Sequence, residues 1–139
     1  EVRRHMEKAD IYLFTSDFNE GWGAVLNESM NSGCAVVASH AIGSVPFLIK
    51  NGENGLIYEN GNQLDLEKQV LRLLEDGAFR KKIAENAYET MINLWNAETA
   101  AERFLTLTEK LLKNENTDSL FLDGPCSKAA ILKNDWYQH

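Results

Sequence analysis

The sequence lacks a long apolar run and is poor in basic residues. Its 139 residues contain no uninterrupted apolar stretch of the ~18 residues that a membrane-spanning helix needs, and we expect neither a membrane span nor a signal peptide. There are 14 Lys and Arg against 21 Asp and Glu, which gives a formal net charge of −7. Nucleic acids and anionic lipids reward clustered positive charge, so we expect no nucleic-acid binding. The chain is predicted to be cytoplasmic.

Cysteine is also scarce, with only Cys34 and Cys126 in the whole chain. The two residues lie far apart in the sequence and match no metal-ligand spacing, so we expect reduced thiols and no metal site. Cys34 begins an apolar run and is predicted to be a small core residue, whereas nothing around Cys126 indicates nucleophilic chemistry.

The apolar residues that are present predict an α/β fold. Ala9–Phe14 and Cys34–Ser39 read as buried strands of a parallel sheet, the first preceded by the end of a helix. Between the strands, one face of a helix that ends near Gly33 is marked by Val25, Leu26, Ser29 and Met30. A strand, a helix and a strand with short connections predict a parallel βαβ unit, whose ligands bind at the carboxyl ends of the strands.

The rest of the chain is predicted to add a third strand and then helices. Residues 44–49 suit only a short helix with Ser44 as N-cap, and Leu56–Tyr58 reads as a strand after a turn. From Leu64 onward, apolar residues at helical spacing predict three amphipathic helices, the last capped by Asn96, and we expect their leucines to lie in a single core. Gly124–Ser127 is expected to begin one more short element.

The most informative stretch lies between the first two predicted strands. Glu20 and Glu28 are separated by seven residues, and Gly21 and Gly23 follow the first of these carboxylates. Glycine lets a backbone approach a ligand closely, and the unpartnered N–H groups at a helix start attract phosphate. With a helix beginning at these glycines, Glu28 is expected about two turns into it. The two carboxylates are thus predicted to frame an anion site.

With these elements placed, residues 9–112 resemble the carboxyl-terminal domain of the family-4 (group 1) glycosyltransferases, retaining enzymes of the GT-B architecture. The most specific feature is that family's signature of two Glu residues with seven residues between them, here Glu20 to Glu28. Supporting features are Ala9–Asp10, Met30 with Gly33, the Gly43 and Pro46 loop, and the Asn51–Gly55 turn. The resemblance implies a partial Rossmann-like domain with about three parallel strands, the fourth to sixth of the complete sheet, followed by helices.

The resemblance also implies roles for individual residues. Glu20 is expected to contact hydroxyls of the donor sugar and is the candidate catalytic residue, and Glu28 is expected to contact the ribose diol. Backbone N–H groups between them are expected to face the diphosphate without a metal, and these come from Gly21, Trp22, Gly23, Ala24 and Val25. The chain contains no Asp-x-Asp, the metal site of the other main glycosyltransferase fold.

Parts of the complete enzyme are expected to lie outside these residues, namely an acceptor-binding amino-terminal domain and basic residues that contact the leaving diphosphate. We expect residues 1–113 to form the partial nucleotide-sugar-binding domain. Residues 114–139 are expected to form a tail that crosses to the absent domain in a complete enzyme, and that domain would carry any peripheral membrane association. The uncovered edge of the first strand predicts self-association.

Several nearby side chains have open roles. Trp22 either stacks on a sugar or base or packs within the domain, and His40 either donates a hydrogen bond to the sugar or is solvated. Ser16 and Asn19 serve either turn geometry or the site. Phe47 stands where an acidic residue is common in the family, which leaves sugar and acceptor contacts open.

The sequence therefore predicts the donor-binding portion of a retaining glycosyltransferase that uses a nucleotide diphosphate sugar, expected to be a UDP-sugar, in cell-surface glycan synthesis. No cofactor is expected. These residues alone are expected to show no turnover and at best weak donor binding. Two alternatives stay open: a noncatalytic protein-binding domain of the same fold, and a sugar-nucleotide epimerase. The sequence upstream of Glu1 would discriminate among them.

Overall fold

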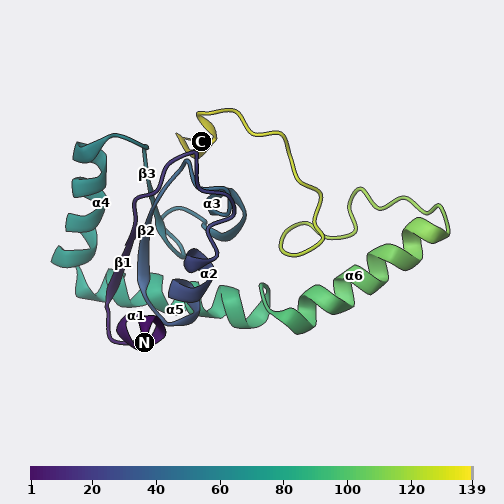
Figure 1. Cartoon of the computed structure of the whole chain (residues 1–139), viewed down its shortest axis with the longest axis horizontal. Helices are drawn as coiled ribbons and strands as arrows, with labels where there is room; N and C mark the ends of the chain where they lie inside the picture. The colour runs from purple at the N-terminus through teal and green to yellow at the C-terminus, as the bar shows by residue number, and fades with distance from the viewer. Residues whose placement is uncertain (139) are drawn as a thin grey trace. The chain divides into compact units, whose positions relative to one another are not determined.

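The computed structural model, which describes residues 1–138, contains a sheet of three parallel strands, as the sequence predicts. The strands are β1 (Ile11–Phe14), β2 (Ala35–Ser39) and β3 (Leu56–Tyr58), in the spatial order β1-β2-β3 (Figure 1). Ile11 lies opposite Ala35 in the first pair, and Val37 lies opposite Leu56 in the second. Because β1 stands at the edge of this sheet, its outer side pairs with no strand among the described residues.

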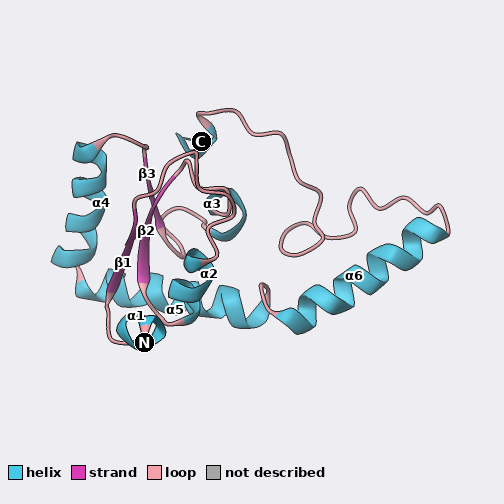
Figure 2. Cartoon of the chain, in the orientation of Figure 1, coloured by secondary structure: helices cyan, strands magenta, loops and turns pink. Residues whose placement is uncertain are grey.

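Helices cover both faces of the sheet (Figure 2). On one face, α4 (Gln63–Glu75) and α5 (Gly77–Asn93) enclose a cluster of Ala35, Val37, Leu56, Tyr58, Leu73 and Ile83. The pleat turns Val36 and Ala38 to the opposite face, where α2 (Val25–Asn31) and α3 (Val45–Leu48) lie. All five residues of β2 are buried, which is the burial expected of the central strand.

Helix α2 begins later than the sequence predicts. Gly23 adopts φ +74°, a left-handed conformation that cannot belong to a right-handed helix, so α2 starts only at Val25. Glu28 consequently lies in the first turn, and the expectation of about two turns before it is wrong. The predicted end is confirmed, because Gly33 adopts φ +81° just after the helix and its N–H donates to the Met30 carbonyl at 3.1 Å.

The first helix, α1 (Val2–Met6), is tied to the sheet through Cys34. The Cys34 thiol is fully buried and donates to the backbone carbonyl of Met6 at 3.2 Å. Burial, assisted by the charge of Asp10, raises the pKa of this thiol. Cys34 is therefore the core residue that the sequence predicts.

The turn between α3 and β3 is fastened by one buried side chain, Asn54. Its Oδ1 accepts the Lys50 N–H at 2.7 Å, and its Nδ2 donates to the Leu48 carbonyl and to Thr90 Oγ1, both at 2.9 Å. Thr90 belongs to α5, so Asn54 joins this turn to the helix behind it.

The helix leucines do not all lie in the core, so that expectation is wrong. In α4 only Gln69 and Leu73 are buried, while Leu64 and Leu74 are exposed. The helix α6 (Ala97–Leu112), capped by Asn96 as predicted, has no buried residue. The three short strands have a small surface, and in α4 mainly the residues around Leu73 reach it.

The chain divides into two compact units, Glu1–Met91 and Ile92–His139. In the second unit, the Arg103 guanidinium lies 4.7 Å from the centre of the Phe121 ring and donates to the Asp123 carbonyl. Gly124–Ser127 forms a turn, and the short 3-10 helix η1 (Trp136–Gln138) follows later. The domain boundary predicted at residue 113 stays a prediction. None of the helices within residues 1–138 has the length and hydrophobicity needed to span a membrane.

Candidate functional site

Most of the predicted site residues lie at the carboxyl edge of the sheet, in the loops that follow the strands, whereas Glu28 lies in α2. Residues 15–24 follow β1, and residues 40–44 follow β2. Because parallel strands place their carboxyl ends at one edge, these loops become neighbours although they are distant in sequence.

Glu20 is held by a tight turn. The Glu20 N–H donates to the Asp17 carbonyl at 3.0 Å, and Asp17 Oδ1 in turn accepts the Asn19 N–H at 2.8 Å. Ser16 Oγ donates to Glu20 Oε2 at 3.1 Å. Ser16 therefore positions the carboxylate, and Asn19 contributes turn geometry through its backbone.

The glycine turn after Glu20 is clamped to the loop after β2. The Gly43 N–H donates to the Gly21 carbonyl and the Ser44 N–H donates to the Trp22 carbonyl, each at 3.1 Å. A Cβ added at Gly43 would lie only 2.4 Å from the Gly21 oxygen, so glycine is required for this approach. Ser44 uses its backbone here and makes no side-chain cap on α3, unlike the sequence prediction.

Gly23 closes the turn against the core. A Cβ at this position would lie 2.8 Å from the Phe14 ring and 3.0 Å from the Ile42 side chain. The turn thus rests directly on the end of β1 and on the loop after β2.

Trp22 projects from the turn and stacks on Phe47 of α3. The ring centroids are 5.7 Å apart and the planes differ by 25°. The indole Nε1 donates to Asn27 Oδ1 at 2.9 Å, which fixes the orientation of the ring. The residues are 25 positions apart in the sequence, so no local pattern could predict this contact.

Glu28 lines a cavity of about 420 Å³ between α1 and α2. Its other lining residues are Glu1, Val2, Arg3, Asn31 and Ser32. Tyr12 of β1 lies within electrostatic range of both signature carboxylates. Burial raises the pKa of the Tyr12 hydroxyl first, and the negative charges of Cys34, Glu28 and Glu20 raise it further. Sequence reasoning missed Tyr12, which resembles any other apolar residue of a buried strand.

The turn offers backbone donors. Within residues 1–138, the N–H groups of Gly21, Gly23, Ala24 and Val25 make no hydrogen bond to a protein acceptor. With only seven residues, α2 adds a weak dipole, so an anion here would be held chiefly by hydrogen bonds from these N–H groups.

His40 lies in the loop after β2 and is nine-tenths buried rather than solvated. Its Nδ1 accepts the Asn60 N–H at 2.9 Å, which assigns the proton of the neutral ring to Nε2. Burial lowers the pKa of His40, partly offset by the Tyr58 carbonyl and the charge of Glu59. The ring also meets Phe18 edge to face, with centroids 5.7 Å apart.

We expect the lowered pKa of His40 to make stability depend on pH. An unfolded His titrates near pH ~6.5. His40 therefore stabilises the fold fully above that value, and this stabilisation is lost as the pH falls through the lower folded pKa. Urea denaturation at a series of pH values should show a decline that is absent in His40→Gln and persists in the exposed control His5→Gln. The same decline in His40→Gln would contradict this account.

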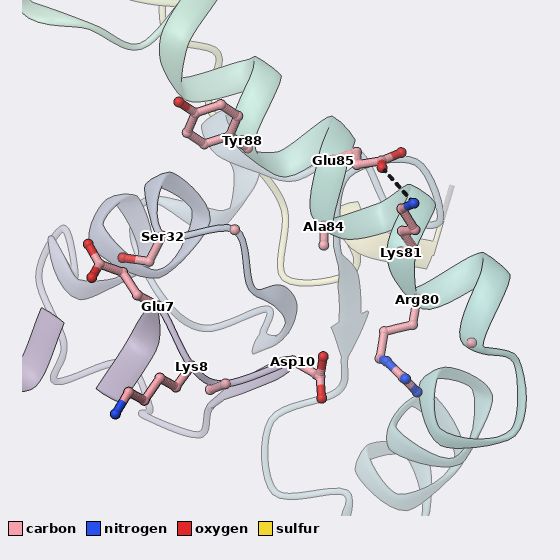
Figure 3. Close-up of a pocket in the computed structure, with 12 residues that line it drawn as sticks. Glu7, Lys8, Asp10, Ser32, Arg80, Lys81, Ala84, Glu85 and Tyr88 are labelled. Atoms are coloured by element: carbon pink, nitrogen blue, oxygen red, sulfur yellow. Dashed lines mark ion pairs between the residues drawn. The ribbon is translucent and has the colours of Figure 1, made fainter. Parts of the chain in front are cut away.

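A cavity of about 570 Å³ at the opposite, amino-terminal edge contains none of the predicted site residues (Figure 3). Its walls carry charges of both signs, and Lys81 and Glu85 on one wall pair with each other at 3.7 Å. Among the described residues, no group of three or more His, Cys, Asp or Glu side chains could hold a metal ion. The geometry therefore favours the carboxyl edge as the candidate site.

Comparison with known proteins identifies a family. A family model described as "Glycosyl transferases group 1" matches residues 1–90. The D-inositol 3-phosphate glycosyltransferase of Corynebacterium glutamicum is 33% identical over 110 residues, which are 79% of this chain and 26% of that protein. The chain spans between 26% and 31% of the length of four such curated relatives.

Solved structures resemble the fold. The carboxyl-terminal domain of the group 1 glycosyl transferase LpcC from Francisella tularensis aligns with a TM-score of 0.58 and 33% identity, covering 63% of this chain and 44% of that one. Anabaena HepE in complex with UDP aligns with a TM-score of 0.57 and 27% identity, covering 80% and 28%. HepE has also been solved with UDP-glucose.

Proposed function

Because the chain belongs to the group 1 glycosyl transferase family and has the fold of its carboxyl-terminal, donor-binding domain, we propose that it binds the nucleotide sugar of a retaining glycosyltransferase at the carboxyl edge of its sheet. One observation carries the proposal. Glu20 is oriented by Ser16 just before a clamped glycine turn, and Glu28 follows that turn in the first turn of α2, where it lines a cavity between α1 and α2. The two carboxylates therefore flank a set of backbone donors.

The nucleoside occupies the cavity beside Glu28. A carboxylate has two oxygens and can accept a hydrogen bond from each hydroxyl of a vicinal diol, as in ribose. The cavity of about 420 Å³ falls within the ~300–1,000 Å³ range typical of small-ligand sites. Glu28 thus selects a ribonucleotide.

The diphosphate lies against the turn. The N–H groups of Gly21 and Gly23–Val25 have no acceptor among the described residues, and charge-assisted hydrogen bonds to phosphate oxygens would satisfy them. During transfer, the bond between the anomeric carbon and the diphosphate oxygen breaks while a bond to the acceptor hydroxyl oxygen forms, and the hydroxyl proton passes to the departing diphosphate. Negative charge then builds on the diphosphate, where these preorganised donors stabilise it.

The sugar lies toward Glu20. The hydrogen bond from Ser16 and the turn at Asp17 fix the Glu20 carboxylate before any ligand binds. Binding therefore costs little conformational entropy at this side chain. Glu20 accepts hydrogen bonds from sugar hydroxyls and orients the anomeric carbon. The chain supplies no nucleophile in this scheme.

The proposed donor and product follow from the same resemblance. UDP-sugar is the proposed donor, supported by the UDP and UDP-glucose complexes of HepE, and the product is a cell-surface glycan. These 139 residues alone are proposed to bind the donor weakly and to catalyse no transfer, because the family resemblance implies that the basic contacts to the diphosphate lie outside them.

A double-mutant cycle tests the role of Glu28. Wild-type chain and Glu28→Gln are titrated with UDP and with 2′-deoxy-UDP by ligand-observed NMR. We expect wild type to prefer UDP by about tenfold, which is the effect of one charge-assisted hydrogen bond, and Glu28→Gln to bind both nucleotides nearly equally.

The control is Glu85→Gln, which removes a carboxylate from the opposite edge of the sheet. It should keep the full preference for UDP. Equal binding of both nucleotides to wild type, or a preference that survives in Glu28→Gln, would rule out the ribose contact.

A further inference from the structure

A partly exposed aromatic pair is formed by Trp22, in the turn that follows Glu20, and Phe47 of α3. Trp22 is 42% exposed and Phe47 is 38% exposed, although each ring covers part of the other. Trp22 follows Glu20 by two residues and belongs to the turn that faces the diphosphate. Exposure of apolar ring surface to water is unfavourable in free energy, and a ligand that covered the two rings would remove this penalty.

The pair is also held in place. The Trp22 ring is fixed by its Nε1 bond to Asn27 Oδ1 at 2.9 Å, and its backbone carbonyl accepts the Ser44 N–H at 3.1 Å. Phe47 follows Pro46 in the first turn of α3. Side chains that are already fixed lose little conformational entropy when a ligand binds against them, so this aromatic surface is preorganised for binding.

Pyranose rings match such a wall. A hexose carries C–H bonds on its faces and hydroxyls around its rim, so it can place a face on an aromatic ring while a carboxylate takes its hydroxyls. Glu20 supplies the carboxylate, and the Trp22–Phe47 stack supplies the ring surface. A phenyl ring at position 47 accepts no conventional hydrogen bond, which disfavours a sugar that turns a hydroxyl toward it.

We propose that the Trp22–Phe47 stack is the apolar wall of the hexose subsite and that Phe47 is a specificity-determining residue for the donor sugar. This inference rests on the proposed function, since the hexose reaches the stack only when the nucleotide lies along the turn. The side chains of the stack contact the sugar, whereas only backbone groups of the turn contact the nucleotide. Nucleotide binding and sugar contact can therefore be separated by experiment.

Saturation-transfer NMR on the full chain, with UDP-glucose and with UDP, distinguishes sugar contact from nucleotide binding. In wild type, the hexose protons should receive saturation together with the uracil and ribose protons. In Phe47→Leu, the hexose signal relative to uracil should fall by about two- to tenfold, the range expected for a lost aromatic contact, while UDP affinity stays unchanged. Phe47→Tyr keeps the ring and should restore the hexose signal.

Trp22→Leu provides a second, independent variant with the same expected loss. Tyr88→Leu is the matched control, because Tyr88 is similarly exposed at 43% but lines the cavity at the opposite edge. An unchanged ratio of hexose to uracil signal in Phe47→Leu and Trp22→Leu would overturn the aromatic wall alone. If neither UDP nor UDP-glucose bound the wild-type chain, the donor site itself would be refuted and this inference with it.

Discussion

Gly43→Ala is expected to remove donor binding and to destabilise the fold. The new methyl group would lie 2.4 Å from the Gly21 carbonyl oxygen, which is backbone and cannot swing aside. The loop after β2 must therefore separate from the glycine turn, and the hydrogen bonds from Gly43 and Ser44 break with it. We expect a loss of about 1–3 kcal/mol in the free energy of unfolding.

The substitution should also weaken ligand binding. Displacement of the turn moves the donors of Gly21 and Gly23–Val25 together, so UDP-glucose affinity should fall by more than about tenfold in ligand-observed NMR. Gly52→Ala is the control, because Gly52 has φ +81° and nothing within 4 Å of an added Cβ. It introduces backbone strain far from the turn and should leave affinity unchanged. Wild-type affinity in Gly43→Ala would contradict the claim that the hydrogen bonds of Gly43 and Ser44 hold the turn in its binding geometry.

Asn54→Ala is expected to be the most destabilising of these substitutions, by about 2–4 kcal/mol, since buried partners lose hydrogen bonds that water cannot replace. The Lys50 N–H, the Leu48 carbonyl and Thr90 Oγ1 each lose the bond that Asn54 provides. Because these bonds join one turn to α5, their loss should loosen the turn as a unit. Urea denaturation measures the change.

Asn86→Ala is the matched control for Asn54→Ala. The Asn86 side chain donates to the Glu53 carbonyl of the same turn at 2.8 Å, but this bond is exposed. Its removal should cost only about 0.5–1.5 kcal/mol. If both substitutions destabilise the chain equally, burial is not what makes Asn54 important.

The position of each strand could be predicted from the sequence because short apolar runs bounded by turn residues have few other solutions. Val36 and Val37 lie in a run predicted to be a buried strand, and the structure places them, fully buried, in the central strand. The predicted cap of α6 follows an equally local rule, since the Asn96 side chain accepts the Thr99 N–H three residues on. Local chemistry decides these features.

Features that depend on tertiary contact escaped prediction. The start of α2 depends on Gly23, which adopts a left-handed conformation at a place where the Phe14 ring and Ile42 leave no room for a side chain. Exposure of the leucines in α4 depends on how much sheet surface three short strands provide. Amphipathic spacing reports which face of a helix is apolar, and it carries no information on whether that face finds a partner.

The candidate site divides in the same way. Glu20 and Glu28 are recognised by their spacing, whereas Tyr12 and Phe47 join the site only through packing between loops and strands. The two carboxylates also depend on different supports, because Glu20 is held by its own turn and Glu28 by α2. The sequence alone predicts which residues meet the ligand, but it does not predict the surface around them.

The two backbone hydrogen bonds between residues 21–22 and 43–44 have a consequence for engineering. Because of these bonds, the turn after β1 and the loop after β2 must move together. A library that randomises only the turn would keep the β2 loop selected for the original turn, and most of its members would lose the shared bonds. Combinatorial changes of donor preference should therefore vary both segments together and leave Gly43 fixed.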